Sequence, residues 1–166
     1  EVDSATDEYI NMPMDTLDDT SDNDFTVNEG ENASIVEVDG KNALQLNGGT
    51  SYITTGLETA GLGNDLRVKV KRTSDSTDDQ ILFESPYGSI KAVQGDTGKV
   101  GFTRELYDYS FNYTLPVNEW VELEFKNQQN VIELYVNGSL VDTLGDDEQI
   151  QGRPMRATCM FPMAKV

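Results

Sequence analysis

The sequence of 166 residues predicts an all-β fold, a sandwich of two antiparallel sheets. Three observations predict this class. Short segments alternate apolar with polar residues, and turns rich in Gly, Asn, Asp and Pro separate them at intervals of about 8 to 12 residues. No window of about eleven residues or more has a helical period. The pair Asn137–Gly138 separates "VIELYV" from "SLVDTL", and such a pair favours the type I′ turn of a β-hairpin.

The first part of the chain predicts five strands. Residues 9–14, "YINMPM", contain Pro13, which suits an edge strand because proline cannot donate to a ladder. An acidic loop over residues 15–24 follows. The next four strands alternate apolar and polar residues and are bounded by Asn, Asp and Gly; they cover residues 25–30, 33–38, 43–48 and 51–55.

The second part continues the pattern. "LRVKVKRT" places Leu66, Val68 and Val70 on one face and cations on the other, as expected for a half-buried strand. Alternation and turn residues predict eight strands here, over residues 66–73, 80–85, 88–94, 99–105, 107–115, 120–126, 131–136 and 139–144. The tail over residues 153–166 is expected to add one or two more.

The stretch "YDYSFNYT" contains an aromatic ring at every second position. The rings of Tyr109, Phe111 and Tyr113 share a face with Leu115, and we expect this face to fill the core of the sandwich. A sugar that contacts this strand would then meet its opposite face or its hairpin end, which carry Asp108, Ser110, Asn112 and Tyr107.

The chain is long enough for one domain with its own core. We expect a disordered leader over residues 1–8 and a single, monomeric β-sandwich domain over residues 9–166, cut from a longer protein. The one cysteine, Cys159, lies in "ATCMF" and is expected to be a small buried hydrophobe. No run approaches the about 20 apolar residues of a membrane span, so membrane insertion is not expected.

Net charge and the content of histidine and cysteine argue against several functions. The net charge is −18, and residues 1–40 hold thirteen acidic residues and no Lys or Arg. Such a surface repels phosphate backbones, which argues against nucleic-acid binding. The chain has no histidine, so the Ser–His and Cys–His types of nucleophilic catalysis are excluded. With one cysteine and no histidine, a tetrahedral zinc site is also not expected.

Four stretches resemble the laminin-G-like, concanavalin A-like jelly-roll domains: "NALQLNGGTSYI", "LRVKVKRTSDSTDDQILFES", "YTLPVNEWVELEF" and "IELYVNGSLVDTLGD". The resemblance covers about residues 10 to 162. Residues 80–120 are similar to modules appended to secreted bacterial family 20 β-hexosaminidases and lacto-N-biosidases that act on host glycans. The resemblance implies a secreted or cell-surface bacterial module that binds carbohydrate or packs on a catalytic domain of the same polypeptide.

A group of polar and aromatic residues around adjacent hairpins is the predicted carbohydrate-binding site. Sugar sites combine a ring for stacking with polar groups that bond hydroxyls. The predicted residues are Glu84, Tyr87, Lys91, Gln94, Arg104, Tyr107, Asp108 and Asn112. The alternative is that they are ordinary strand ends with cross-strand charge pairs of little energetic value.

Two acidic patterns remain. Glu122 and Glu124 lie on one strand face at roughly 7 Å, a spacing that glycosidases use. We expect them instead to be the exposed face of a strand whose inner face is apolar, and predict no catalytic residues. Residues 15–29 have the oxygen spacing of a calcium loop, with Asp18, Asp22 and Asp24 as the predicted ligands. A solvated acidic loop is the other interpretation.

The sequence therefore predicts a non-catalytic carbohydrate-binding module with a glycan as its ligand. Three alternatives stay open: a structural spacer on its own catalytic domain, an adhesin domain that binds a protein partner, and a glycosidase that uses Glu122 and Glu124.

Overall fold

The structure is a computed structural model. It describes residues 11–49, 51–55, 65–85, 88–104, 106–128 and 131–145. The chain divides into two compact units, one of Glu1–Glu58 with Met163–Val166 and one of Thr59–Pro162. The described residues contain strands and no helix, which confirms the all-β class. The predicted leader, the tail strands with Cys159, and Tyr87 lie outside the described residues.

The first unit consists of two short antiparallel pairs. Strand β1 (Val27–Glu29) pairs with β4 (Ile53–Thr55), and β2 (Ala33–Val38) forms a hairpin with β3 (Lys41–Leu46). The hairpin turns at Asp39 and Gly40, which have positive φ angles of 54° and 73°. Two successive positive φ angles are typical of the type I′ turn, which matches the twist of the flanking strands.

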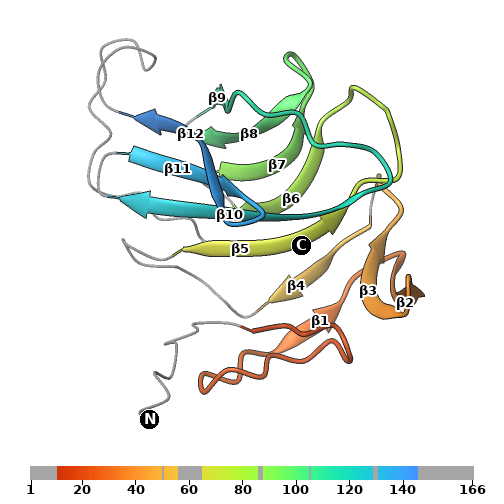
Figure 1. Cartoon of the computed structure of the whole chain (residues 1–166). Coiled ribbons are helices and arrows are strands. Elements are labelled where there is room, and N and C mark those ends of the chain that lie inside the picture. Colours follow the sequence, from red (N-terminus) through yellow and green to blue (C-terminus); the bar gives the residue numbers. More distant parts are fainter. Residues whose placement is uncertain are drawn as a thin grey trace. The chain divides into compact units, whose positions relative to one another are not determined.

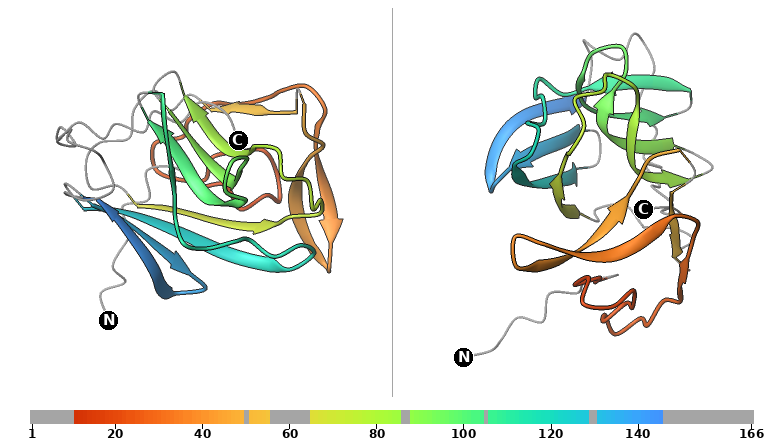
Figure 2. Two further views of the ribbon diagram at one scale, coloured as in Figure 1. Left: turned by 90° about the horizontal axis from the view of Figure 1, so that it is seen from above. Right: turned by 90° about the vertical axis from the view of Figure 1, so that its right-hand side faces the viewer.

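The second unit contains two four-stranded antiparallel sheets. One sheet has the order β12–β11–β10–β5, and the other has the order β6–β7–β8–β9. Figures 1 and 2 show them as separate layers. Their strands are β5 (Leu66–Lys71), β6 (Gln80–Ser85), β7 (Gly88–Gln94), β8 (Lys99–Arg104), β9 (Tyr107–Ser110), β10 (Trp120–Gln128), β11 (Val131–Val136) and β12 (Ser139–Gly145).

The core of the second unit lies between the inner faces of these sheets. On β10, Val121, Leu123 and Phe125 are buried, as the alternation predicts. Phe111, which is fully buried, joins the two sheets. Its ring centroid lies 5.9 Å from that of Phe102 on β8 and 5.9 Å from that of Phe125 on β10. Aromatic pairs at this separation stabilise a core beyond their area of burial.

Strand β9 is shorter than predicted. It ends at Ser110, whereas the alternation predicts a strand to residue 115. Pairing with β8 continues irregularly, because Val100 accepts a hydrogen bond from the backbone N–H of Phe111 and donates one to the carbonyl of Tyr113. These two bonds flank Asn112, which lies exposed between them. The expected core face is nevertheless present, since Phe111 is fully buried and Tyr109 stacks on Phe102 at 4.9 Å.

Two further differences concern the first predicted strand and Trp120, for which the resemblance to jelly-roll domains implies a place in the core. Residues 11–14 are not in a strand, so the prediction for residues 9–14 is wrong over the described part. Trp120, which opens β10, shares the outer face with Glu122 and is only partly buried under Lys71, whose Nζ lies 6.0 Å from the ring centroid. The hairpin at Asn137–Gly138 is confirmed, with φ angles of 49° and 80°.

We predict that Phe111→Ala lowers the free energy of unfolding by about 3 to 5 kcal/mol, because it leaves a cavity between the two sheets. Urea denaturation measures this. The control is Leu140→Ala, which shortens a side chain on a residue that is 52% exposed and should change stability by less than about 1 kcal/mol. An equal loss in both variants would contradict the role of Phe111.

Candidate functional site

The outer face of the β6–β9 sheet is polar. Glu84, Ser89, Thr103 and Asp108 are register neighbours on four successive strands, so their side chains share one face. The opposite face of the same strands carries the core residues Phe83, Ile90 and Phe102. A row of carboxylates and hydroxyls therefore crosses the whole sheet on the side away from the core.

Lys91 is the central residue of this polar face. Its side chain is only 6% exposed, and its Nζ lies 2.8 Å from Oδ2 of Asp79 and 3.4 Å from Oδ1 of Asp108. Thr103 also donates its hydroxyl to the same oxygen of Asp108. A buried ammonium needs opposite charges and hydrogen bonds to offset its lost hydration. The two carboxylates supply both, and they connect β7 to β9 and to the segment before β6.

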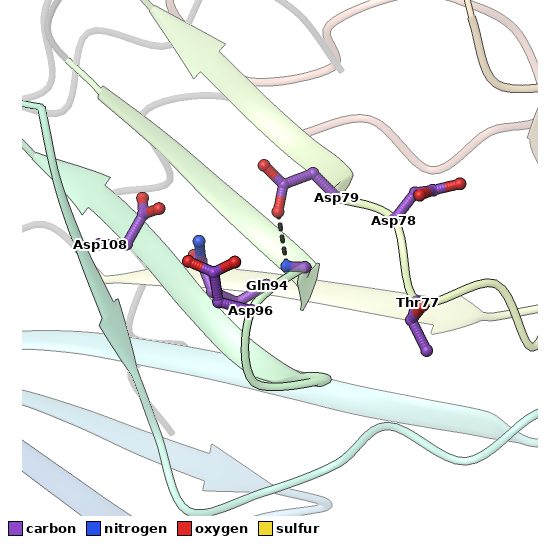
Figure 3. Close-up of a pocket in the computed structure, with 7 residues that line it drawn as sticks. Thr77, Asp78, Asp79, Gln94, Asp96 and Asp108 are labelled. Atoms are coloured by element: carbon purple, nitrogen blue, oxygen red, sulfur yellow. Dashed lines mark hydrogen bonds between the residues drawn. The ribbon is translucent and has the colours of Figure 1, made fainter.

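Asp79 is held on both of its oxygens. Besides the bond from Lys91, its Oδ1 accepts the backbone N–H of Gly95 at 2.6 Å, which the dashed line of Figure 3 marks. The hydrogen bond from Lys91 lowers the pKa of Asp79 below its ordinary value, and the bond from Gly95 lowers it further. These two effects together exceed the opposing effect of burial, which raises the pKa. Asp79 therefore stays ionised and fixes the loop before β6 against the turn after β7.

These contacts surround an open depression of about 370 Å³. It lies in the second unit, between the loop before β6 and the turn that joins β7 to β8 (Figure 3). We call it the polar depression, and its lining consists of Thr77, Asp78, Asp79, Gln94, Gly95, Asp96 and Asp108. Four of the seven residues are aspartates, and none is aromatic.

Gln94 contributes a buried acceptor without a partner. The residue is 2% exposed, and its Oε1 accepts no hydrogen bond from the described part of the chain. Figure 3 shows its side chain between Asp108 and Asp79. It lies over Gly101, where an added Cβ would approach Oε1 to 3.2 Å and would also clash with the carbonyl of Tyr109. A buried acceptor left unpaired costs about 1 to 3 kcal/mol, and the oxygen of Gln94 has almost no exposed surface.

The structure brings together part of the predicted site. Lys91, Gln94 and Asp108 meet at the polar depression, and Glu84 lies on the same outer face. Arg104 and Tyr107 do not join them. They are neighbours at the far end of β8 and β9, in register with each other and one position beyond Thr103 and Asp108, which places them on the other face.

Asn112 lies beyond the end of β9. Its side-chain oxygen accepts a hydrogen bond from Lys99 at 3.0 Å, and its backbone N–H donates to Asp142 at 2.6 Å. It therefore connects the turn region of β8 to β12 and does not line the depression. Tyr87 lies outside the described residues.

Sequence reasoning missed the residues of two loops. The loop over residues 73–79 and the turn over residues 95–98 contain none of the predicted site residues, yet they supply Thr77, Asp78, Asp79, Gly95 and Asp96. A signal was present in the predicted hairpin. Because β6 and β7 are antiparallel neighbours, the segment before β6 and the turn after β7 must lie at the same end of the sheet.

Both carboxylates of the acid pair on β10 have cationic partners. Nη2 of Arg67 on β5 lies 2.8 Å from Oε1 of Glu124, and its Nε lies 4.0 Å from Oε1 of Glu122. Nζ of Lys126 lies 3.8 Å from Oε1 of Glu124. The pKa of Arg67 is raised by its hydrogen bond to Glu124. Val121, Leu123 and Phe125 face inward on the same strand, as expected. Both carboxylates thus belong to a cross-strand charge network on the outer face of the second sheet.

The acidic loop is organised by an aspartate that the calcium spacing does not include. Asp19 is 6% exposed and accepts backbone N–H groups from Asn11, Ser21 and Phe25, each at 2.9 Å. The hydroxyl of Ser21 adds a fourth bond at 2.8 Å. Burial raises the pKa of Asp19, but these hydrogen bonds outweigh it and the net shift is downward.

The predicted calcium ligands Asp18, Asp22 and Asp24 are exposed. Within the described ranges, no three carboxylates are grouped so that they could hold a metal ion. Calcium binding at this loop therefore stays a prediction.

Comparisons with solved structures show what the fold resembles. Domain 4 of AbnA, an extracellular GH43 arabinanase from Geobacillus stearothermophilus solved with arabinotriose, matches with a TM-score of 0.63 and 18% identity, over 90% of this chain and 76% of its own. The binding domain of botulinum neurotoxin serotype C1 matches with a TM-score of 0.61 and 16% identity, over 95% of this chain and 42% of the toxin chain.

A further structure is that of botulinum neurotoxin type C, whose cell entry depends on interaction with two ganglioside molecules. It matches with a TM-score of 0.59 and 18% identity, over 95% of this chain and 42% of its own. The chain thus spans less than half of the type C toxin chains that it matches. No family model and no curated protein sequence matches the chain. At these identities the comparisons show the fold, a jelly-roll-like β-sandwich.

We predict that Lys91→Met lowers the free energy of unfolding at pH 7 by about 1 to 3 kcal/mol. This is less than the about 3 to 5 kcal/mol for a fully buried pair, because Asp79 and Asp108 have side chains that are 46% and 43% exposed. Lys69→Met, which removes an exposed lysine of β5, is the control and should change stability by less than about 0.5 kcal/mol.

The same variant should change the acid sensitivity of the fold. A carboxyl whose pKa is lower in the folded state stabilises the fold above its unfolded pKa, and this stability is lost as pH falls through the folded pKa. The wild-type protein should therefore lose the Asp79 contribution below about pH 4, and Lys91→Met should lose less. Urea denaturation between pH 7 and pH 2.5 measures both curves, and parallel curves would contradict the coupling of Lys91 to Asp79.

We predict that Asp19→Ala loosens the loop over residues 11–25. The amide hydrogens of Ser21 and Phe25 should exchange at least about tenfold faster, because they lose a charged acceptor. The matched control is Asp18→Ala, which removes the adjacent exposed carboxylate and should leave both rates unchanged. Hydrogen exchange followed by NMR decides between the two residues, and equal acceleration would contradict the role of Asp19.

Proposed function

We propose that the chain is a non-catalytic carbohydrate-binding module and that the polar depression is its glycan site. The observation that carries the proposal is an open depression of about 370 Å³ whose lining carboxylates, Asp96 and Asp108, still have acceptor oxygens without a partner among the described residues. Sugar hydroxyls are donors that can satisfy such groups. The fold supports the proposal too, since the arabinanase domain was solved with arabinotriose and the type C toxin interacts with gangliosides.

The chemistry of the depression suits hydroxyl recognition. Lys91 has three ammonium hydrogens and two carboxylate partners, so one hydrogen can be donated to a ligand oxygen. Asp96 and Oδ2 of Asp108 accept no hydrogen bond from the described residues. The rigid anchoring of Asp79 holds these groups in place before a ligand arrives, which reduces the entropy lost on binding.

A module with an open, exposed site is expected to bind a single sugar weakly. Its value then lies in holding a larger enzyme near its substrate, because a tethered second contact raises the effective concentration. We propose that the chain is an accessory module of a secreted or cell-surface bacterial glycoside hydrolase that acts on host-type glycans. This context rests on the resemblance of residues 80–120 to modules of family 20 β-hexosaminidases and lacto-N-biosidases. The described part of the chain contains no helix that is long and apolar enough to cross a membrane.

The module is proposed to be non-catalytic because the acid pair with the spacing of a glycosidase, Glu122 and Glu124, forms ion pairs with Arg67. Glu124 is largely buried and bonded to Arg67, so hydrolysis through Glu122 and Glu124 would have to break the charge network of the second sheet.

One observation favours a second candidate, in which the module docks on a protein surface. Leu106 is 97% exposed with a positive φ of 70°, and the adjacent Tyr107 is 53% exposed. An exposed leucine in a strained conformation at a hairpin end is typical of a contact residue. The surface would be that of its own catalytic domain, for a spacer, or of another protein, for an adhesin. A bound structural calcium at Asp18, Asp22 and Asp24 remains a separate proposal.

Isothermal titration of the 166-residue protein with neutral glycans tests the proposed function. Galactose, N-acetylglucosamine and lacto-N-biose would be titrated with and without calcium, and at least one is expected to bind. Gln94→Met should weaken that binding about twofold to tenfold without lowering stability, since it removes an acceptor that has no partner. Glu122→Gln, on the outer face of the other sheet, is the control and should bind like the wild type.

Two results would count against this proposal. Heat from none of the glycans would remove the sugar-binding function and leave the docking function as the better candidate. Binding that is lost in Glu122→Gln but kept in Gln94→Met would move the site to the other sheet.

A further inference from the structure

The sequence contains two Asn–Gly pairs, Asn47–Gly48 and Asn137–Gly138. In such a pair the backbone nitrogen of glycine can attack the side-chain amide carbon of asparagine, because glycine has no side chain to block the approach. The bond from that carbon to the NH2 group breaks, and ammonia leaves with the proton of the glycine N–H. A five-membered succinimide remains. Water then opens this ring to aspartate or to isoaspartate, in which an extra methylene lies in the backbone.

Exposure does not distinguish the two pairs. All four residues are exposed. A Cβ added at Gly48 or at Gly138 would meet no heavy atom within 4 Å outside the adjacent residues, so both turns are open around the attacking nitrogen. The rate at each pair therefore depends on how firmly the structure holds its asparagine.

Asn137 is held by two bonds to β10. Its Oδ1 accepts the backbone N–H of Glu122 at 3.0 Å, and its own backbone N–H donates to the carbonyl of Glu122 at 2.9 Å. Asn137 and Gly138 also form the type I′ turn, with φ angles of 49° and 80°. Closure of the succinimide ring rotates the side chain and the backbone of Asn137 away from this geometry. The side-chain bond and the turn must therefore open before the reaction can occur.

The side chain of Asn47 has a weaker contact. Its Oδ1 accepts Nε2 of Gln45 at 3.1 Å, and both side chains are exposed, so water can replace this bond at little cost. The backbone N–H of Asn47 donates to the hydroxyl of Ser51 at 3.0 Å. The β2–β3 ladder ends at Leu46, one residue earlier, so ring closure at Asn47 does not require any ladder pair to open.

We propose that Asn47 is a site of spontaneous deamidation in the folded protein and that the β11–β12 hairpin protects Asn137. The modification adds a negative charge to an exposed turn of the first unit. Since Asn47 follows the last ladder pair, the β2–β3 hairpin tolerates the extra methylene and the modified chain stays folded. At Asn137 the same methylene would lengthen the two-residue turn that sets the pairing of Val136 with Ser139.

The test follows both pairs in one sample. The 166-residue protein is incubated at mildly alkaline pH with and without denaturing guanidinium chloride, and peptide mass spectrometry measures the mass increase that replacement of NH2 by OH causes. In denaturant the two pairs should react within about threefold of each other, because neither keeps its contacts. In the folded protein Asn47 should keep its denatured rate within about threefold, whereas Asn137 should react at least about tenfold more slowly.

A variant with a matched control assigns the reaction to Asn47. Asn47→Gln keeps the amide but would have to close a six-membered ring, so the fast mass increase of the folded protein should disappear. Asn47 has no positive φ angle, so glutamine fits its backbone. The control is Asn42→Gln, which changes an exposed asparagine of β3 that precedes alanine and should leave the rate at Asn47 unchanged.

Three results would overturn the inference. Equal rates at the two pairs in the folded protein would remove the protection of Asn137. A folded rate at Asn47 at least about tenfold below its denatured rate would remove Asn47 as the site. Loss of amide protection on β2 and β3 in the modified protein, measured by hydrogen exchange, would contradict the tolerance of the change. None of these outcomes depends on whether the protein binds a sugar.

Discussion

The buried ammonium of Lys91 is the constraint on which the functional face depends. An ammonium that is 6% exposed is stable only with charge partners, and Asp79 and Asp108 provide them from opposite sides. The same contacts hold the loop before β6 and strand β9 against β7. The cluster of Lys91, Asp79 and Asp108 therefore stabilises the outer face of the sheet and also fixes the position of the loop before β6.

The depression follows from that constraint. Asp79, fixed by Lys91 and by the backbone N–H of Gly95, connects the loop before β6 to the turn after β7 at the edge of the depression. The missing side chain at Gly101 leaves room for the amide of Gln94 to lie across the sheet, although nothing in the described residues bonds its oxygen. On the outer face of the opposite sheet, Arg67 and Lys126 already partner the carboxylate of Glu124.

Much of the fold could be predicted from alternation. Strands β2, β6, β7 and β11 have the predicted bounds, because each is a regular run between turn residues. The end of β9 could not be predicted, since the exposed Asn112 interrupts the ladder without changing the sequence pattern. Within the candidate site, residue type alone predicts Lys91 and Asp108 as members. The part played by Asp79 could not be predicted in this way, because it depends on which loops lie at the same end of the sheet. The spacing of the acidic loop emphasised Asp18, but backbone geometry selects Asp19 as the buried acceptor.

Mapping the amides during a sugar titration tests the central claim most directly, that the polar depression is the glycan site. Backbone and side-chain amide signals of the 166-residue protein would be followed by two-dimensional NMR as galactose, N-acetylglucosamine or lacto-N-biose is added. The account predicts that Gly95, Asp96 and the side-chain amide of Gln94 shift together, while Glu122 and its neighbours on β10 stay unchanged. Shifts confined to β10 or to the hairpin end at Leu106 and Tyr107, with no change at Gln94, would contradict it.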